Sequence, residues 1–99
     1  MSYFPIVFSP RAKRDLEEIY AYTRNSWSKA QADSYLDKIE ACIHQLAENP
    51  NLGRPRPEIR ANYRSLTKES HTVFYKISTR DIHILGIVHN RMDITNRMF

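Results

Sequence analysis

The sequence predicts a single α+β domain in which a helical hairpin packs on one antiparallel sheet. Two long segments show the apolar spacing of amphipathic helices, and four short segments are rich in β-branched and aromatic residues. The links between the last three short segments are so short that they require antiparallel pairing. Ninety-nine residues, 41% of them hydrophobic, suffice for one core. The predicted order over residues 1–99 is β-α-α-β-β-β: strand 3–8, helices 9–25 and 28–49, and strands 62–67, 71–77 and 82–89.

The first strand and the first helix are predicted from residues 3–25. The segment 3–8, YFPIVF, has strand composition, and Pro5 indicates an edge position or a bulge because it cannot donate to a ladder. Ser9 is a favourable N-cap, and Pro10 is typical of the first helical position. Apolar side chains then recur every three to four residues until about Asn25, which predicts one buried helix face.

The second helix is predicted from a capping box and a proline stop. Ser28 and Gln31 have the spacing of a reciprocal cap, and a sustained apolar stripe follows them. Asn49 ends the helix because Pro50 disfavours the helical conformation of the residue before it. Only a short link containing Trp27 separates the two helices, so they should form an antiparallel hairpin.

The connector between the second helix and the sheet is stiff and positively charged. Residues 50–66 read PNLGRPRPEIRANYRSL, and the chain's net charge of +4 is concentrated in its second half. Residues 1–49 hold six Lys or Arg against seven Asp or Glu, whereas residues 50–99 hold nine against four. Arginine forks suit carboxylates and phosphates, and prolines reduce the entropy lost on binding. A partner should therefore meet this half of the chain, although a structural crossover alone explains the prolines and the glycine.

The register of the last hairpin predicts what each sheet face carries. With residues 78–81 as the turn, Ile77 faces Ile82 and His71 faces Val88. The apolar face, expected to pack on the helices, then carries Val73, Tyr75, Ile77, Ile82, Ile84 and Val88. The mixed face, interpreted as a docking surface, carries Phe74, Leu85 and Ile87 with Lys76, His83 and His89. A slip of one residue would reverse the assignment.

Arg64, His71, Tyr75 and His89 are the residues from which an RNA-cleaving site could be built. Two imidazoles, a tyrosine and an arginine could supply an acid, a base and a phosphate clamp. The predicted register argues against such a site, because it puts His71 and His89 on opposite faces of the sheet.

No metal or cofactor is expected. Four histidines and one cysteine lack ligand-like spacing, and two glycines cannot form a phosphate-cradling loop. Cys42 is alone within a helical pattern, which predicts a buried, inert thiol and suits a reducing cytosol. No apolar run approaches the roughly 20 residues of a membrane span, and residues 1–18 do not read as a signal peptide. A cytoplasmic location is expected.

The segments SPRAKRDLEEIYAYT, LAENPNLGRPRPEIR, YRSL, HTVFY and IVHNRMD occur in an order that resembles the ParE branch of the RelE/ParE toxin superfamily. The resemblance covers nearly the whole chain and implies the fold described above. It implies a toxin of a type II toxin–antitoxin pair that poisons DNA gyrase and is not itself a nuclease. It also implies a ParD-like antitoxin whose C-terminal segment wraps the toxin. RelE-like relatives instead cleave messenger RNA on the ribosome.

Two departures favour the gyrase poison over the nuclease. RelE-type nucleases generally need a basic residue in the strand that here reads HTVFY, where Thr72 stands, and their tails usually end near a tyrosine or histidine. The alternative remains an endoribonuclease using Arg64, His71 and His89. A plain nucleic-acid-binding module ranks last, for want of an aromatic stacking platform. The expected target contacts are Arg64, His89, Arg91, Asp93 and Arg97, and the expected antitoxin contacts are Tyr22, Arg54, Arg56, Arg60, Phe74, Leu85 and Ile87.

Overall fold

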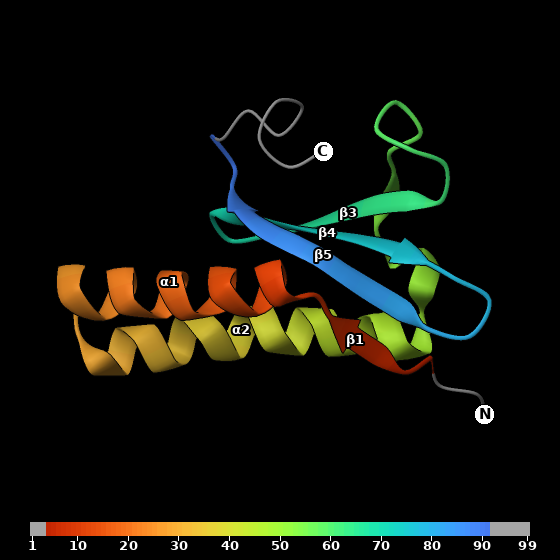
Figure 1. The fold of residues 1–99 in the computed structure, drawn as a ribbon. Coiled ribbons are helices and arrows are strands. Elements are labelled where there is room, and N and C mark those ends of the chain that lie inside the picture. The colour runs from red at the N-terminus through yellow and green to blue at the C-terminus, as the bar shows by residue number, and fades with distance from the viewer. Residues whose placement is uncertain (1–3, 92–99) are drawn as a thin grey trace.

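A computed structural model describes residues 4–91 and consists of two helices packed on one face of a five-stranded sheet (Figure 1). The strand order is β1-β5-β4-β3-β2, with β1 parallel to β5 and all other pairs antiparallel. The predicted α+β class and the β-α-α-β-β-β order are confirmed. The elements are β1 (Ile6–Phe8), α1 (Pro10–Ser26), α2 (Lys29–Glu48), the 3-10 turn η1 (Pro50–Leu52), β2 (Arg54–Pro55), β3 (Tyr63–Lys68), β4 (His71–Ile77) and β5 (Ile82–His89).

Both helices begin at the predicted caps. The Ser9 hydroxyl accepts a hydrogen bond from the Ala12 N–H at 3.0 Å, and it donates one to the Leu85 carbonyl at 3.0 Å. The Ser28 hydroxyl accepts from the Gln31 N–H at 3.0 Å. Ser9 therefore caps α1 and also ties its start to β5, which fixes the helix on the sheet.

The N-terminal strand and the arginine-rich connector differ from the prediction. β1 is shorter than predicted, with Pro5 just before it, but it does lie at the edge of the sheet. Part of the connector forms η1 and the two-residue strand β2, which pairs with β3. Sequence analysis predicted neither, because a strand of two residues has no periodicity to detect. β3 starts after Asn62, which adopts a left-handed φ of 68°.

A β-bulge corrects the predicted register of the β4–β5 hairpin. Ile77 pairs with Ile82 and Tyr75 with Ile84, as predicted, but Phe74 then pairs with Gly86, so that Leu85 is the extra residue. The remaining pairs are shifted by one residue.

The shift overturns the prediction for the two histidines. His71 pairs with His89, not with Val88, and Val73 pairs with Ile87. His71 and His89 therefore share one face of the sheet, and the prediction that they point to opposite faces was wrong. The physical reason is the extra residue at Leu85, whose carbonyl accepts a hydrogen bond from the Ser9 hydroxyl at the start of α1.

The core lies between the helices and the sheet and includes Ile87, which is 3% exposed. Sequence analysis had placed Ile87 on the docking face and Val88 against the helices. The bulge exchanges them, so Val88 shares the opposite face with Phe74. The buried side chains that join the two layers are Ile39, Ile43, Leu46, Val73, Tyr75, Ile82, Ile84 and Ile87. Neither described helix combines the length and hydropathy required of a membrane span.

Candidate functional site

The arginine-rich connector is anchored to the sheet by Tyr75 and Arg64. The buried Tyr75 hydroxyl accepts a hydrogen bond from the Gly53 N–H at 2.8 Å and donates one to the Pro50 carbonyl at 2.7 Å. Burial raises the pKa of Tyr75. The Arg64 guanidinium donates to the carbonyls of Gly53 (3.0 Å) and Asn51 (3.3 Å). These two side chains therefore hold the path of the connector, and Tyr75 does not face a solvent-accessible site.

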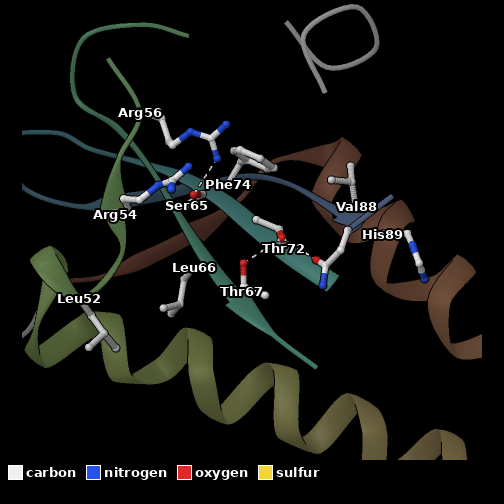
Figure 2. A pocket seen from close by; sticks show the side chains of 11 residues that line it. Leu52, Arg54, Arg56, Ser65, Leu66, Thr67, Thr72, Phe74, Val88 and His89 are labelled. Atoms are coloured by element: carbon white, nitrogen blue, oxygen red, sulfur yellow. Dashed lines mark hydrogen bonds between the residues drawn. The ribbon is translucent and has the colours of Figure 1, made fainter. Parts of the chain in front are cut away.

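A cavity of about 480 Å³, here called the outer basin, lies on the sheet face opposite the helices (Figure 2). The Arg56 guanidinium lies 5.4 Å from the centroid of the Phe74 ring, and it donates to the Ser65 hydroxyl at 3.1 Å and to Glu58 at 2.6 Å. Arg54 is exposed; with Arg56, whose hydrogen bond is the larger cause, it lowers the pKa of the Glu58 carboxyl. The basin is lined by Leu52, Arg54, Arg56, Ser65, Leu66, Thr67, Thr72, Phe74, Val88, His89 and Asn90.

Hydroxyl and amide groups form the floor of the outer basin between its arginines and the end of β5. The Thr72 hydroxyl donates to Asn90 Oδ1 at 2.7 Å and lies 3.1 Å from the Thr67 hydroxyl. Figure 2 shows Thr67 and Thr72 between Arg54 and Arg56 on one side and Val88 and His89 on the other. The Thr72 proton is used on Asn90 and the Thr67 proton on Thr72, so the groups left to donate to an anion such as a carboxylate are the guanidinium groups and the Ser65 hydroxyl.

A second concave surface, the helix-side groove, lies between the helices and the ends of β4 and β5. It consists of two cavities of about 350 and 330 Å³ that share Tyr22, His71 and His89. Tyr22 and Trp27 are 72% and 73% exposed, so two large aromatic side chains face solvent at this groove. The groove is lined by Arg11, Asp15, Glu18, Ile19, Tyr22, Thr23, Trp27, Gln31, Tyr35, Ser70, His71, Ile87, Val88 and His89.

Hydrogen bonds hold both histidines of the groove at Nδ1. The Tyr35 hydroxyl lies 2.7 Å from His71 Nδ1 and accepts the Ser70 N–H at 3.0 Å. We therefore assign the Tyr35 hydroxyl as the donor and His71 Nδ1 as the acceptor of this hydrogen bond. The neutral His71 ring then carries its own proton on Nε2. His89 Nδ1 accepts the Arg91 N–H at 3.2 Å, which implies the same tautomer. Burial, with a contribution from nearby His89, lowers the pKa of His71 and favours its neutral form.

The two histidine rings are close, with centroids 5.3 Å apart. Arg64 is remote from them, because it pairs with Tyr75, four residues along β4 from His71. That separation is roughly 13 Å in a strand. The structure thus joins two members of the predicted catalytic trio and leaves the third elsewhere.

The residues predicted to bind an antitoxin lie on two surfaces. Arg54, Arg56 and Phe74 line the outer basin, and Tyr22 and Ile87 line the helix-side groove. Arg60 is exposed beyond β2, and half-buried Leu85 occupies the bulge, so both lie outside these cavities.

Only some of the residues predicted to bind the target lie at the end of β5. His89 and Arg91 lie there, whereas Asp93 and Arg97 lie outside the described residues.

Sequence analysis did not select Trp27 or Tyr35 as site residues. A large aromatic residue in a very short helical link was an available signal for Trp27. Nothing local could have linked Tyr35 to His71, because the contact joins residues 36 positions apart.

The described residues hold no group of three or more His, Cys, Asp or Glu suited to a metal ion. Cys42 is buried, as predicted, and burial raises the pKa of its thiol.

The fold and these surfaces define a small α+β domain that offers a cationic basin and an aromatic groove to other molecules. The chain belongs to the family described as "ParE toxin of type II toxin-antitoxin system, parDE", whose model matches residues 6–94. It is thus a toxin of a type II toxin–antitoxin system, and the resemblance seen in the sequence is confirmed.

Curated relatives and solved structures agree with this assignment. The chain is 37% identical over 89 residues to Toxin ParE1 of Caulobacter vibrioides, covering 90% of this chain and 92% of that one. It is 38% identical over 93 residues to Toxin ParE1 of Mycobacterium tuberculosis H37Rv, covering 93% and 95%.

Two solved structures share the fold. One is titled "Chromosomal ParDE TA system from P. aeruginosa", with a TM-score of 0.77 and 22% identity over 88% of this chain and 96% of that one. The other is the RelBE2 toxin–antitoxin complex of M. tuberculosis, with a TM-score of 0.63 and 19% identity over 89% and 99%.

Proposed function

We propose that the chain inhibits DNA gyrase in the cytoplasm and that a ParD-like antitoxin neutralises it. The observation that carries the gyrase proposal is the separation of Arg64 from the two groove histidines, roughly 13 Å along β4. A site that cleaves a phosphodiester needs an acid, a base and a cation around one phosphate. In the tautomers assigned above, both rings carry a proton on Nε2, so that atom could donate a proton but could not accept one. Arg64 is bound to the connector.

A gyrase poison needs no acid–base pair, because it only has to bind one state of its target more tightly than the others. The proposed contact surface is the end of β5 and the residues that follow it. His89 and Arg91 belong to this end, and Asp93 and Arg97 follow in sequence. Arg64 lies four residues along β4 from that end, so its remaining donors would make a separate contact with the target.

The antitoxin proposal rests on the two surfaces and on the relatives. The solved relatives carry titles naming a ParDE system and a RelBE2 toxin–antitoxin complex. In this chain, the exposed Tyr22, Arg54 and Arg60 and the half-buried Arg56 are proposed antitoxin contacts. Buried Phe74 and Ile87 would form the floors of the outer basin and the groove, and Leu85 would act indirectly by setting the register.

Messenger RNA cleavage is the second candidate function. The close approach of His71 and His89 favours it, since two imidazoles at that separation could act on one phosphate after one ring changed tautomer.

Induced expression in bacteria separates the two candidates. We expect DNA damage and filamentation while bulk translation continues at first, and the purified chain should inhibit supercoiling by gyrase. Deleting residues 91–99 should abolish toxicity, with an unchanged circular dichroism spectrum as the control for folding. Rapid loss of translation with cleaved ribosome-bound messages, and normal supercoiling, would overturn the gyrase proposal in favour of RNA cleavage.

A further inference from the structure

We infer that the outer basin binds a phosphodiester of the DNA held by gyrase, through Arg54, Arg56 and the Ser65 hydroxyl. This inference rests on the proposed inhibition of gyrase, in which the end of β5 contacts the enzyme. It adds a second contact for the same domain, with the DNA bound to that enzyme, and names the chemical group that is recognised.

The donors of the basin are held in place before a ligand binds. Arg56 donates to Glu58 from Nε at 2.6 Å and to the Ser65 hydroxyl from Nη1 at 3.1 Å. Its guanidinium also lies 5.4 Å from the centroid of the Phe74 ring, and Arg54 lines the same cavity (Figure 2). These contacts leave Arg56 Nη2 and the Ser65 proton to donate to a ligand. Because the Arg56 side chain is only 16% exposed, little side-chain entropy remains to be lost when it binds an anion.

The lining of the basin contains no carboxylate that would repel a phosphate. Its eleven residues include two arginines and no Asp or Glu. Glu58, which is bonded to Arg56, is not part of the lining. A guanidinium group binds phosphate oxygens with the same fork of donors that it offers to a carboxylate. A phosphate in the basin would therefore meet net positive charge.

Positive charge continues beyond the basin along the outer face of the sheet. Lys76 lies two residues from Phe74 on β4 and therefore on the same face. The nearby carboxylate of Asp81 is already bonded to Ser78 and His83. Duplex DNA carries one negative charge per roughly 1.7 Å of its axis. A row of cations suits such a chain of phosphates better than it suits a single anionic group.

The contact is expected with the sugar–phosphate backbone and not with the bases. Phe74 is 1% exposed, so its ring cannot stack on a base. Contacts with the backbone need only charge and hydrogen-bond donors, and they carry no sequence information. The basin should therefore bind whatever DNA sequence gyrase holds.

The other side of the domain determines which face meets the DNA. The helices lie on the face of the sheet opposite the basin (Figure 1). A cavity of about 430 Å³ lined only by residues of α1 and α2 carries the carboxylates of Glu17, Asp33, Asp37 and Glu40. DNA is repelled by this negative charge and attracted by the basin. The domain therefore meets DNA with the outer face of its sheet.

The basin and the proposed gyrase contact belong to one continuous surface. His89 lines the basin and also lies at the end of β5 that is proposed to contact gyrase. The register places Arg54 three strand spacings from Gly86, and His89 lies three residues further along β5. These steps are roughly 14 Å and 10 Å at right angles, or roughly 17 Å directly. One face of this small domain can therefore reach the enzyme and its DNA together. The antitoxin, proposed to contact the same arginines, and DNA would occupy the basin in turn.

Binding of the purified chain to immobilised gyrase, with and without a bound DNA duplex, tests the inference. DNA should raise the affinity of the wild-type chain at least about fivefold, because the DNA contact adds to the enzyme contact. Arg54→Gln should bind gyrase without DNA within about twofold of the wild-type affinity and should lose most of the gain from DNA. Arg54→Lys should retain most of that gain, since an ammonium group also binds phosphate.

Arg14→Gln is the matched control. Arg14 is exposed on α1, on the other side of the sheet from the basin, so its replacement should leave both affinities within about twofold of wild type. Circular dichroism and thermal melts show whether each variant is folded. The exposed Arg54 should tolerate both of its substitutions.

Salt dependence identifies the group that Arg54 contacts. Each phosphate that a protein cation neutralises contributes about 0.9 to the slope of log affinity against log salt concentration. With DNA present, the slope should be about 0.9 smaller for Arg54→Gln than for the wild-type chain. Without DNA, the two slopes should agree.

Any of three results would overturn the inference. One is a wild-type affinity that DNA does not change. Another is a loss of affinity in Arg54→Gln that is equal with and without DNA, which would place Arg54 on gyrase itself. The last is an Arg54→Gln variant that binds the antitoxin more weakly but keeps the full gain from DNA, which would assign the basin to the antitoxin alone.

The same measurements separate this inference from the proposal on which it rests. In each of those three results the chain still binds gyrase, so the gyrase proposal stands and only the DNA contact is removed. A wild-type chain that binds gyrase in neither state removes the gyrase proposal and this inference with it.

Discussion

Replacing Tyr75 by phenylalanine tests whether a buried hydroxyl holds the arginine-rich connector in place. The change removes one oxygen and leaves the ring in the core. That oxygen accepts the buried Gly53 N–H and donates to the Pro50 carbonyl. The connector positions Arg54 and Arg56 beside the outer basin, so the substitution acts on the binding surface from inside the protein.

The magnitude follows from the two hydrogen bonds. A buried N–H without an acceptor costs about 1–3 kcal/mol, and a typical intramolecular hydrogen bond contributes about 0.5–1.5 kcal/mol. The free energy of unfolding should fall by roughly 2–3 kcal/mol. For a domain of about 100 residues, 1 kcal/mol corresponds to about 4–8 °C, so Tm should fall by roughly 10–20 °C. A total stability of about 5–15 kcal/mol leaves the variant folded.

Urea unfolding followed by tyrosine fluorescence and circular dichroism measures the change. Tyr22→Phe is the matched control: its ring is 72% exposed, and removing its hydroxyl should change stability by less than about 0.5 kcal/mol. If Tyr75→Phe is as stable as Tyr22→Phe, the Tyr75 hydroxyl does not anchor the connector.

Substitutions at three further positions, Gly53, Ser9 and His71, test contacts that hold the fold together. Gly53→Ala should destabilise by about 1–3 kcal/mol in thermal melts, since its Cβ would lie 2.5 Å from Tyr75 Oη; unchanged stability would refute this close packing. Ser9→Ala should cost about 1–2 kcal/mol, because it removes the α1 cap and the bond to Leu85, whereas Ser9→Thr should retain most of the stability. The pKa of His71 is lowered from 6.5, so the folded chain binds fewer protons than the unfolded chain, and stability should fall as pH drops below about 6.5. His71→Gln should flatten that part of the profile in urea titrations, and an unchanged slope would refute its origin in this ring.

The helices and the class of the fold were predictable because their signals are local. Ser9 with Pro10 and Ser28 with Gln31 lie within one helical turn of the ends that they set. The helical caps therefore needed no knowledge of the sheet. Strand composition and short links likewise sufficed for β3, β4 and β5, whose bounds lie within one residue of the prediction.

The roles of the arginines were not predictable, because a guanidinium binds a carbonyl as readily as a carboxylate. Arg64 lies in the same arginine-rich stretch, residues 50–66, as Arg54. Its guanidinium is nevertheless bound to backbone carbonyls of the connector. Arg54, ten residues earlier, faces the outer basin. The difference depends on β2 pairing with β3, which brings the connector alongside Arg64.

The β-bulge at Leu85 links the error in the predicted register to the form of the binding surface. Without the extra residue, Val88 would face the helices and His89 would face outward, on one surface with Phe74. With it, Val88 points to the outer basin, and His89 joins His71 at the groove. Ser9 stabilises the bulge by bonding the Leu85 carbonyl, and Asp15 bonds the Ile87 N–H just beyond it. The same contacts that fix α1 on the sheet therefore decide which side chains face each cavity, and they leave the end of β5 as the place where the two cavities meet.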